Sequence, residues 1–260
     1  MADGRAWTRE EAMAAFTLYC QLPFGRLHKG NPDIIALASG MERTPSAVAL
    51  KLVNFAGLDP AIIASGRTGM RHASRQDRAI WDEFHADWNG RVSEGEQLLQ
   101  AFTALPHGTA NDAEETVPFA EGETREATVQ IRLQQGFFRR SILSIYGRRC
   151  CMSGITDERL LVASHIIPWA QDRRNRLNPR NGLCLSALHD RAFDRFLITA
   201  TPDGIIHVSE TLTQTKQPSA IMQTSLLALE GQRIALPERF VPDPSFLSWH
   251  NEQFAQTSRR

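Results

Sequence analysis

Residues 150–197 read CCMSGITDERLLVASHIIPWAQDRRNRLNPRNGLCLSALHDRAFDRFL, and this stretch decides the fold of the C-terminal half of the chain. Residues 160–166 are apolar and β-prone, which predicts a strand that ends before Pro168. Residues 181–186 predict a second short strand, and Ser186 is suited to cap the helix that follows it. The predicted order of elements is therefore strand, loop, strand, helix.

Three side chains able to take part in chemistry fall at the ends of these elements. His165 ends the first predicted strand, Asn181 begins the second, and His189 lies in the first turn of the helix. A neutral imidazole can take a proton from water, and a second imidazole or a carboxylate can hold a cation. An amide can orient the loop that carries the base. Hydrolysis of a phosphodiester bond needs such a base, a cation and positive groups that hold the backbone.

Charge is distributed unevenly along a chain whose formal net charge is zero. Residues 128–200 hold twelve arginines and five acidic residues, a net charge of 12 − 5 = +7, whereas residues 91–127 have 2 − 8 = −6. Arginine forms forked contacts with phosphate, so this block predicts a nucleic-acid partner. The alternative is a solvated basic surface neutralised by the acidic segment. The candidate phosphate contacts are Arg139, Arg140, Arg173, Arg174, Arg176 and Arg180.

The pattern ASHIIPW…NPRNGLCLSALHDRAFD resembles the His-Asn-His (HNH) endonucleases over roughly residues 136–210, and is closest to a bacterial subgroup with Ser-His-Ile in its first motif. The resemblance implies a ββα-metal fold that cleaves DNA. It implies that His165 is the general base, that Asn181 holds the base's loop and that His189 ligates a divalent cation.

The chain also departs from the pattern of that family. Many members carry a metal-binding Asp before the first His, where this chain has Ser164, and some carry a second His where it has Phe193. Asp190 and Asp194 are available carboxylates, and Asp194 is the one we favour beside His189, although a spacing of five residues does not put the two on one helix face. Mg²⁺ is the expected cofactor, with Mn²⁺ or Ni²⁺ as alternatives.

Some relatives hold a structural zinc with two Cys-x-x-Cys pairs. Here Cys150 is followed three residues later by Ser153, and Cys184 by Ala187, so neither pair is complete. We therefore expect no structural zinc. The cysteines are expected to be reduced, because we interpret the chain as cytoplasmic. No apolar run approaches the length that spans a bilayer, so no membrane partner is expected.

Residues 1–102 predict a helical domain. Thr8 and Glu11 form a capping box, and Asn31 and Thr44 are suited to cap two short helices within residues 31–60. Two such helices joined by a tight turn are typical of a helix-turn-helix, whose second helix would contact DNA. The candidate DNA contacts there are Arg43 and Lys51. The alternative is a small helical bundle that packs or dimerises.

These patterns predict an α+β chain: a helical N-terminal domain that resembles a helix-turn-helix, an acidic linker over residues 103–127, and a nuclease domain over residues 128–260 that includes a C-terminal hairpin and tail. The predicted function is metal-dependent DNA cleavage, in restriction or defence by resemblance. The alternative is a DNA-binding protein whose nuclease domain is degenerate or depends on a partner. Cutting both strands with one site per chain would call for a homodimer.

Overall fold

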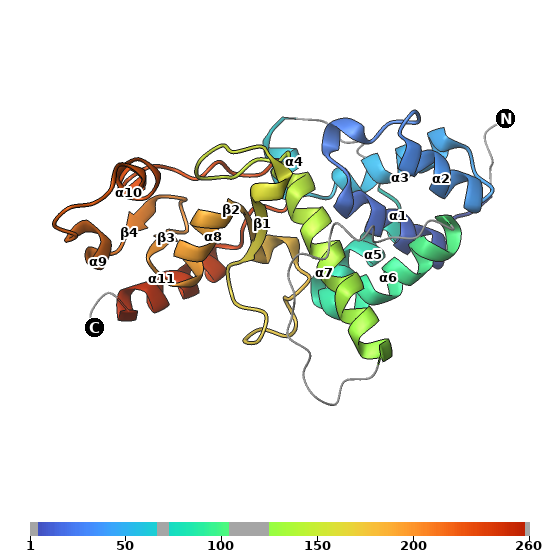
Figure 1. Ribbon diagram of the computed structural model, residues 1–260. Coiled ribbons are helices and arrows are strands. Elements are labelled where there is room, and N and C mark those ends of the chain that lie inside the picture. The colour runs from blue at the N-terminus through green and yellow to red at the C-terminus, as the bar shows by residue number, and fades with distance from the viewer. Residues whose placement is uncertain (1–4, 67–72, 104–124, 258–260) are drawn as a thin grey trace. The chain divides into compact units, whose positions relative to one another are not determined.

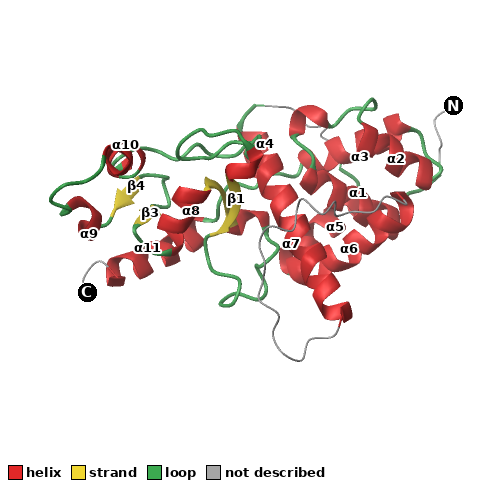
Figure 2. Ribbon diagram, in the orientation of Figure 1, coloured by secondary structure: helices red, strands yellow, loops and turns green. Residues whose placement is uncertain are grey.

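The computed structural model describes residues 5–66, 73–103 and 125–257, and the chain divides into two compact units, residues 1–145 and 146–260 (Figure 1). Each unit is considered by itself. Within the described residues, the strands occur in the second unit alone, as Figure 2 shows. No helix in these ranges is long and apolar enough to cross a membrane.

The N-terminal unit is helical, and local capping signals begin several of its helices. Thr8 and Glu11 form the predicted capping box, and the side chains of Asn31 and Thr44 accept backbone N–H bonds at their helix starts. The ring of Phe16 packs among other aromatic rings at the centre of this unit. The helices are α1 (Arg9–Gln21), α2 (Pro32–Gly40), α3 (Pro45–Ala56), α4 (Pro60–Ala64), α5 (Arg75–Ala86), α6 (Trp88–Thr103) and α7 (Arg125–Ile145).

Helix α7 belongs to the N-terminal unit, whereas residues 128–260 were predicted to form the nuclease domain. Its buried Phe137 and Ile142 pack with α1 and α6, and Arg140 hydrogen-bonds to Gln21 and Glu96. These partners lie far away in the sequence, so the local pattern did not indicate them. Most of the predicted linker, residues 104–124, lies outside the described residues.

The C-terminal unit begins with two antiparallel strands and a helix. Strand β1 (Leu161–His165) pairs with β2 (Gly182–Ser186), with Leu161 opposite Ser186 and His165 opposite Gly182. Helix α8 (Ala187–Asp194) follows β2 directly, begins at the predicted cap and packs against both strands. This is the strand, loop, strand, helix order that the sequence predicts.

A second hairpin and a tail complete this unit. Strands β3 (Ile198–Ala200) and β4 (Ile206–Val208) pair around a turn in which Gly204 has a φ of +83°, a conformation that favours glycine. The hairpin was expected from the sequence. The remaining helices are α9 (Glu210–Thr213), α10 (Ala220–Ser225) and α11 (Pro244–Thr257).

His250 on α11 is buried in the core of this unit. Its Nε2–H donates to the carbonyl of Phe193 at 3.2 Å, and its Nδ1 accepts from the hydroxyl of Thr199 at 2.8 Å. Burial lowers the pKa of His250 to about 4, because the charged ring would lose its hydration. The folded unit therefore holds this ring in its neutral form.

We expect the C-terminal unit to lose stability as the pH falls from 6.5 towards 4. In this window the unfolded chain protonates His250 while the folded chain does not, so the full stability is present only above pH 6.5. The expected loss from this ring is about 3 kcal/mol. Urea unfolding across this pH range measures it. His250→Gln keeps a donor and an acceptor and should remove this ring's share of the dependence; an unchanged slope would contradict the prediction.

Candidate active site

Asn181 lies fully buried directly before β2, as the last residue of a short 3-10 helix (Pro179–Asn181), and fixes the loop that follows β1. Its side-chain carbonyl accepts the N–H of Ile167 at 2.8 Å, and its amide nitrogen donates to the carbonyls of Ile167 at 3.1 Å and Asn175 at 3.2 Å. Its backbone carbonyl accepts the N–H of Ile166 at 3.0 Å. A buried amide with all of these bonds made is rigid. Asn181 therefore holds the two residues that come directly after His165.

His165 is half-buried at the end of β1, where its Nε2 lies 2.8 Å from the backbone carbonyl of Arg176. A carbonyl can only accept, so Nε2 carries the hydrogen and the basic lone pair resides on Nδ1. Burial lowers the pKa of His165 to about 4, against the opposing effect of this hydrogen bond. The ring is therefore neutral at physiological pH and able to accept a proton.

His189 has a protein partner at each of its two ring nitrogens. The ring is buried, with Nδ1 3.4 Å from Sγ of Cys150 and Nε2 2.9 Å from the carbonyl of Ser225. The interaction with His189 lowers the pKa of Cys150 to about 6, although burial opposes the shift. Both ring nitrogens of His189 thus have protein partners. The assignment of His189 to the metal stays a prediction, and a cation there would have to displace the thiol from Nδ1.

Asp190, the next residue on α8, lies beside the strand that carries the base. The hydroxyl of Ser164 is close enough to its carboxylate to stabilise the charged form, though not in good hydrogen-bond geometry. Burial nevertheless raises the pKa of Asp190, so the neighbouring Ser164 and Arg191 do not make up for the hydration that this carboxylate loses. Asp194 is four residues further on, and residues at this spacing share a helix face. It is exposed at the last turn.

The pair Asp190 and Asp194 is thus a second candidate for holding a cation, beside the predicted pair His189 and Asp194. The signal was present in the sequence as two carboxylates one helical turn apart. Both are hard oxygen donors of the kind that Mg²⁺ and Mn²⁺ prefer. In the described parts of the chain, no group of three or more His, Cys, Asp or Glu side chains converges on one point. Mg²⁺ needs only one or two protein carboxylates, because waters and substrate phosphate complete its shell.

Comparison with known proteins bears on this segment. Residues 150–199 match the family model described as HNH endonuclease. The match covers β1, β2 and α8 and ends within β3. It therefore contains His165, Asn181, Asp190 and Asp194, but it does not reach the N-terminal unit. No curated protein matches the chain. We call residues 150–199 the HNH segment. The match supports nuclease chemistry with DNA as substrate.

The loop of the HNH segment between β1 and β2 carries cations without acidic partners. Arg173 and Arg174 are exposed and Arg176 is half-buried, and within the described ranges none of the three forms an ion pair. Arg180 differs, because its guanidinium pairs with Asp243 at 3.1 Å and its Nε donates to the carbonyl of Val241. The structure thus leaves three of the four predicted loop arginines available to phosphate.

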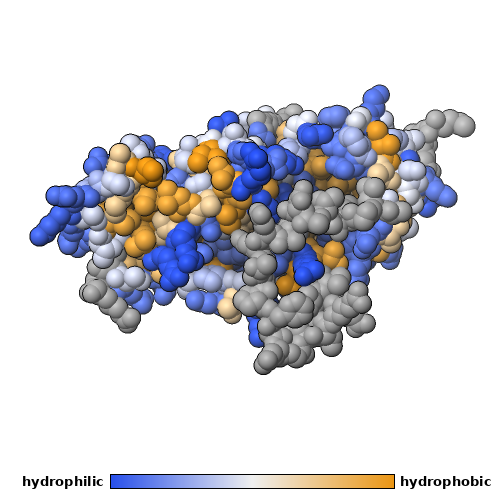
Figure 3. Space-filling view, in the orientation of Figure 1, coloured by the Kyte–Doolittle hydropathy of each residue, from blue (hydrophilic) through white to orange (hydrophobic). Residues whose placement is uncertain are grey.

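A surface cavity of about 440 Å³ lies beside the first turn of α8. It is lined by His189 and Ser225 together with apolar side chains such as Ile155, Leu160 and Leu188, and no Lys or Arg lines it. Figure 3 shows apolar surface gathered over this part of the C-terminal unit. A cavity without cations is poorly suited to the DNA backbone. We therefore place the candidate active site at His165 and Asp190 and not at this cavity.

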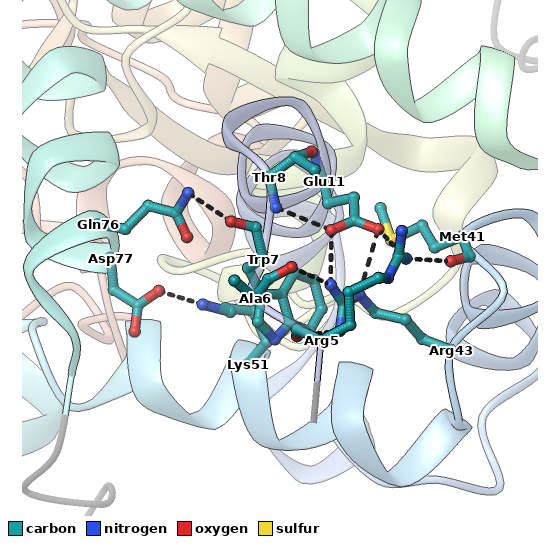
Figure 4. A network of polar contacts seen from close by, with 10 residues as sticks. All are labelled: Arg5, Ala6, Trp7, Thr8, Glu11, Met41, Arg43, Lys51, Gln76 and Asp77. Carbon is teal, nitrogen blue, oxygen red and sulfur yellow. Dashed lines mark hydrogen bonds and ion pairs between the residues drawn. The ribbon is translucent and has the colours of Figure 1, made fainter. Parts of the chain in front are cut away.

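The predicted DNA contacts of the N-terminal unit are buried. Arg43 is 6 % exposed and bonds to the carboxylate of Glu11, and Lys51 is 5 % exposed and bonds to Asp77 at 2.5 Å. Both cations also lie over the ring of Trp7, as Figure 4 shows. These groups hold the start of the chain against the helices. The predicted role of Arg43 and Lys51 in DNA binding is corrected accordingly.

Helix α3 and Arg140 were also predicted to contact DNA. The exposed positions of α3 include Ser46 and Leu50 and hold no cation, so this helix lacks the charge that a recognition helix presents to DNA. Arg140 pairs with the buried Glu96 at 2.9 Å, which makes it a structural residue of the N-terminal unit. Arg139 lies half-buried on the same helix.

Replacing Lys51 with methionine is expected to destabilise the N-terminal unit by about 3–5 kcal/mol, because Asp77 would stay buried without its cation. DNA affinity should not change, since the ammonium group is not exposed. Urea unfolding and fluorescence anisotropy with a labelled duplex measure the two effects. Arg174→Met is the matched control, with weaker DNA binding and unchanged stability. The opposite pattern for the two variants would restore Lys51 as a DNA contact.

Proposed function

We propose that this protein is a divalent-metal-dependent DNA endonuclease that acts through His165 as general base. The observation that carries the proposal is the arrangement of the HNH segment. There, the buried Asn181 fixes the residues after His165, and Asp190 lies beside Ser164, the residue before it. The proposed base and a carboxylate thus lie at or beside two consecutive residues of β1, next to a loop in which three described arginines form no ion pair.

His165 would begin the reaction by accepting a proton from water on its Nδ1. The Nε2–H bond to the Arg176 carbonyl fixes the tautomer that makes Nδ1 the acceptor. As the proton arrives, the same carbonyl stabilises the imidazolium that forms. The resulting hydroxide attacks phosphorus and displaces the leaving oxygen of the backbone.

Asp190 and Asp194 would hold the cation, and the hydroxyl of Ser164 stands beside them. A bound Mg²⁺ or Mn²⁺ supplies positive charge to the phosphate oxygens and the leaving oxygen in the transition state. The raised pKa of Asp190 supports this assignment, because a cation relieves a carboxylate that burial disfavours. Arg173, Arg174 and Arg176 would hold the DNA backbone on either side of the bond that is cut.

Cleavage of supercoiled plasmid tests the proposal. Relaxed or linear product is expected with Mg²⁺ or Mn²⁺, which carboxylate ligands suit, less with Ni²⁺, which imidazole ligands suit better, and none with EDTA. The ratio of relaxed to linear product reports nicking against double-strand cutting. Intact plasmid with every metal, for methylated and unmethylated DNA alike, would overturn the proposal. By the resemblance of the HNH segment to HNH endonucleases, we place the protein in restriction or defence. The composition of the chain leads us to place it in the cytoplasm. With one site per chain, cutting both strands would call for a homodimer.

A second candidate is a DNA-binding protein whose nuclease is degenerate or depends on a partner. Ser164 favours it, because a hydroxyl is a poor ligand at a position where relatives of the HNH segment carry a metal-binding Asp. Tight DNA binding without cleavage in the plasmid assay is the result that this candidate predicts. Activity that appears only after a co-purified protein is added back would identify the partner-dependent form.

A further inference from the structure

Trp169 touches both the proposed base and a loop arginine, although the mechanism above gives it no role. Its ring meets the His165 ring edge-on, with centroids 5.6 Å apart and planes at 86°. The guanidinium carbon of Arg176 lies 5.0 Å from the centroid of the same indole. Cations at this distance are attracted to the face of an indole ring. One side chain therefore contacts a proton acceptor and a phosphate-binding group.

Hydrogen bonds close these contacts into a triangle. The Nε of Arg176 donates to the backbone carbonyl of Trp169 at 2.7 Å, and the backbone carbonyl of Arg176 accepts from His165 at 2.8 Å. Each of the three residues thus touches the other two. A closed set of contacts fixes the orientation of its members more firmly than single contacts do. We call this set the His165–Trp169–Arg176 triangle.

The presence of a tryptophan at position 169 is not explained by packing in the hydrophobic core. The side chain is half-buried and lies in a loop, whereas the core of the C-terminal unit is built from residues such as Phe193 and Leu183 that are fully buried. Trp249 on α11 offers a comparison, because it is also half-buried and its ring meets that of Phe196 at 6.5 Å. Trp249 touches neither the base nor a loop arginine among the ring contacts of the described residues.

We infer that Trp169 is a positioning residue that holds the His165 ring and the Arg176 guanidinium in fixed relative places. The inference rests on the proposed nuclease function. If this is so, the indole of Trp169 sets both the direction of the Nδ1 lone pair of His165 and the position of the Arg176 guanidinium. Removing the indole should then affect turnover and DNA binding together, and turnover more.

Steady-state cleavage of a labelled duplex by Trp169→Leu tests the inference. We expect kcat to fall about 10- to 100-fold, in line with the effect of a displacement near 1 Å at a reacting group, and KM to rise by a smaller factor. Trp169→Phe keeps an aromatic edge and should recover most of kcat. Trp249→Leu is the matched control and should keep both constants. In an Arg176→Ala background, Trp169→Leu should raise KM no further.

A measurement that does not depend on cleavage separates this inference from the proposed function. Nitrogen-15 NMR of the histidine rings should show His165 as the single Nε2–H tautomer in the wild type and as a mixture in Trp169→Leu. Wild-type kcat and a single tautomer in the variant would overturn the inference. A wild type that never cleaves DNA would overturn the function, and the tautomer spectra would still decide the role of Trp169. If Trp169→Leu unfolds, Trp169→Met replaces it, with thermal unfolding as the check.

Discussion

Replacing His165 with alanine is expected to lower kcat for DNA cleavage about 100- to 10,000-fold, the range that a positioned general base contributes. The pKa of about 4 keeps this ring neutral at pH 7–8, so an assay there measures the base in its active form. The affinity for DNA should stay within about threefold, because the arginines, and not the imidazole, hold the backbone. Single-turnover cleavage and anisotropy in Ca²⁺, which supports binding without turnover, measure the two quantities.

His207→Ala is the matched control for this prediction. His207 lies on β4 of the same unit with a side chain 45 % exposed, and its Nδ1 meets Glu230 at 2.9 Å. Its loss removes an imidazole without touching the candidate site, so cleavage should persist. Equal activity of His165→Ala and the wild type would mean that another group is the base, or that a contaminating nuclease is being measured.

The strand order and the place of the base could be predicted from the sequence because their signals are local. The apolar run before Pro168, the cap at Ser186 and the position of Asn181 each depend on a few neighbouring residues. The structure places His165 at the end of β1 as predicted, and Asn181 one residue before β2 and not in the strand. The match of the HNH segment to a known family supports the same interpretation.

The metal ligands that we propose, Asp190 and Asp194, could not be predicted in the same way. His189 and Asp190 are neighbours, and about 100° of helix rotation separates their side chains. Which of them faces β1 depends on how α8 packs and on Cys150, which lies 39 residues before His189 and takes up one of its nitrogens. The spacing of the His and Asn residues in the sequence does not show how α8 packs.

The cations of the N-terminal unit illustrate the same limit. Arg43 and Lys51 looked like surface groups, since charged residues are rarely buried. Their acids come from other helices: Glu11 is 32 residues from Arg43, and Asp77 is 26 from Lys51. A single sequence does not show which acid will meet which base across such distances. The helices could be predicted from the sequence, but which of their charged side chains are exposed could not.

Asp190→Asn is expected to lower kcat/KM at least about 100-fold at low Mg²⁺, since a catalytic cation contributes several kcal/mol to the transition state. The amide keeps the size of the side chain and removes the charge that would hold the metal. Calorimetric titration with Mn²⁺ should show weaker binding. Asp194→Asn should show the same change to a smaller degree, because that carboxylate is exposed.

The free energy of unfolding of Asp190→Asn distinguishes a metal-binding role of Asp190 from a purely structural one. The pKa of Asp190 is raised by burial, so its charged form opposes folding at neutral pH, and Asp190→Asn should leave the metal-free protein as stable as the wild type or more so. His189→Gln is the comparison, because that ring bonds to Cys150 and Ser225: it should lower stability, and the folded protein should bind Mn²⁺ normally. If His189→Gln abolished metal binding while Asp190→Asn preserved it, His189 would be the ligand after all. If Asp190→Asn loses activity but keeps its stability, Asp190 serves the reaction and not the fold. Functional groups are often buried in positions that lower the stability of the folded protein.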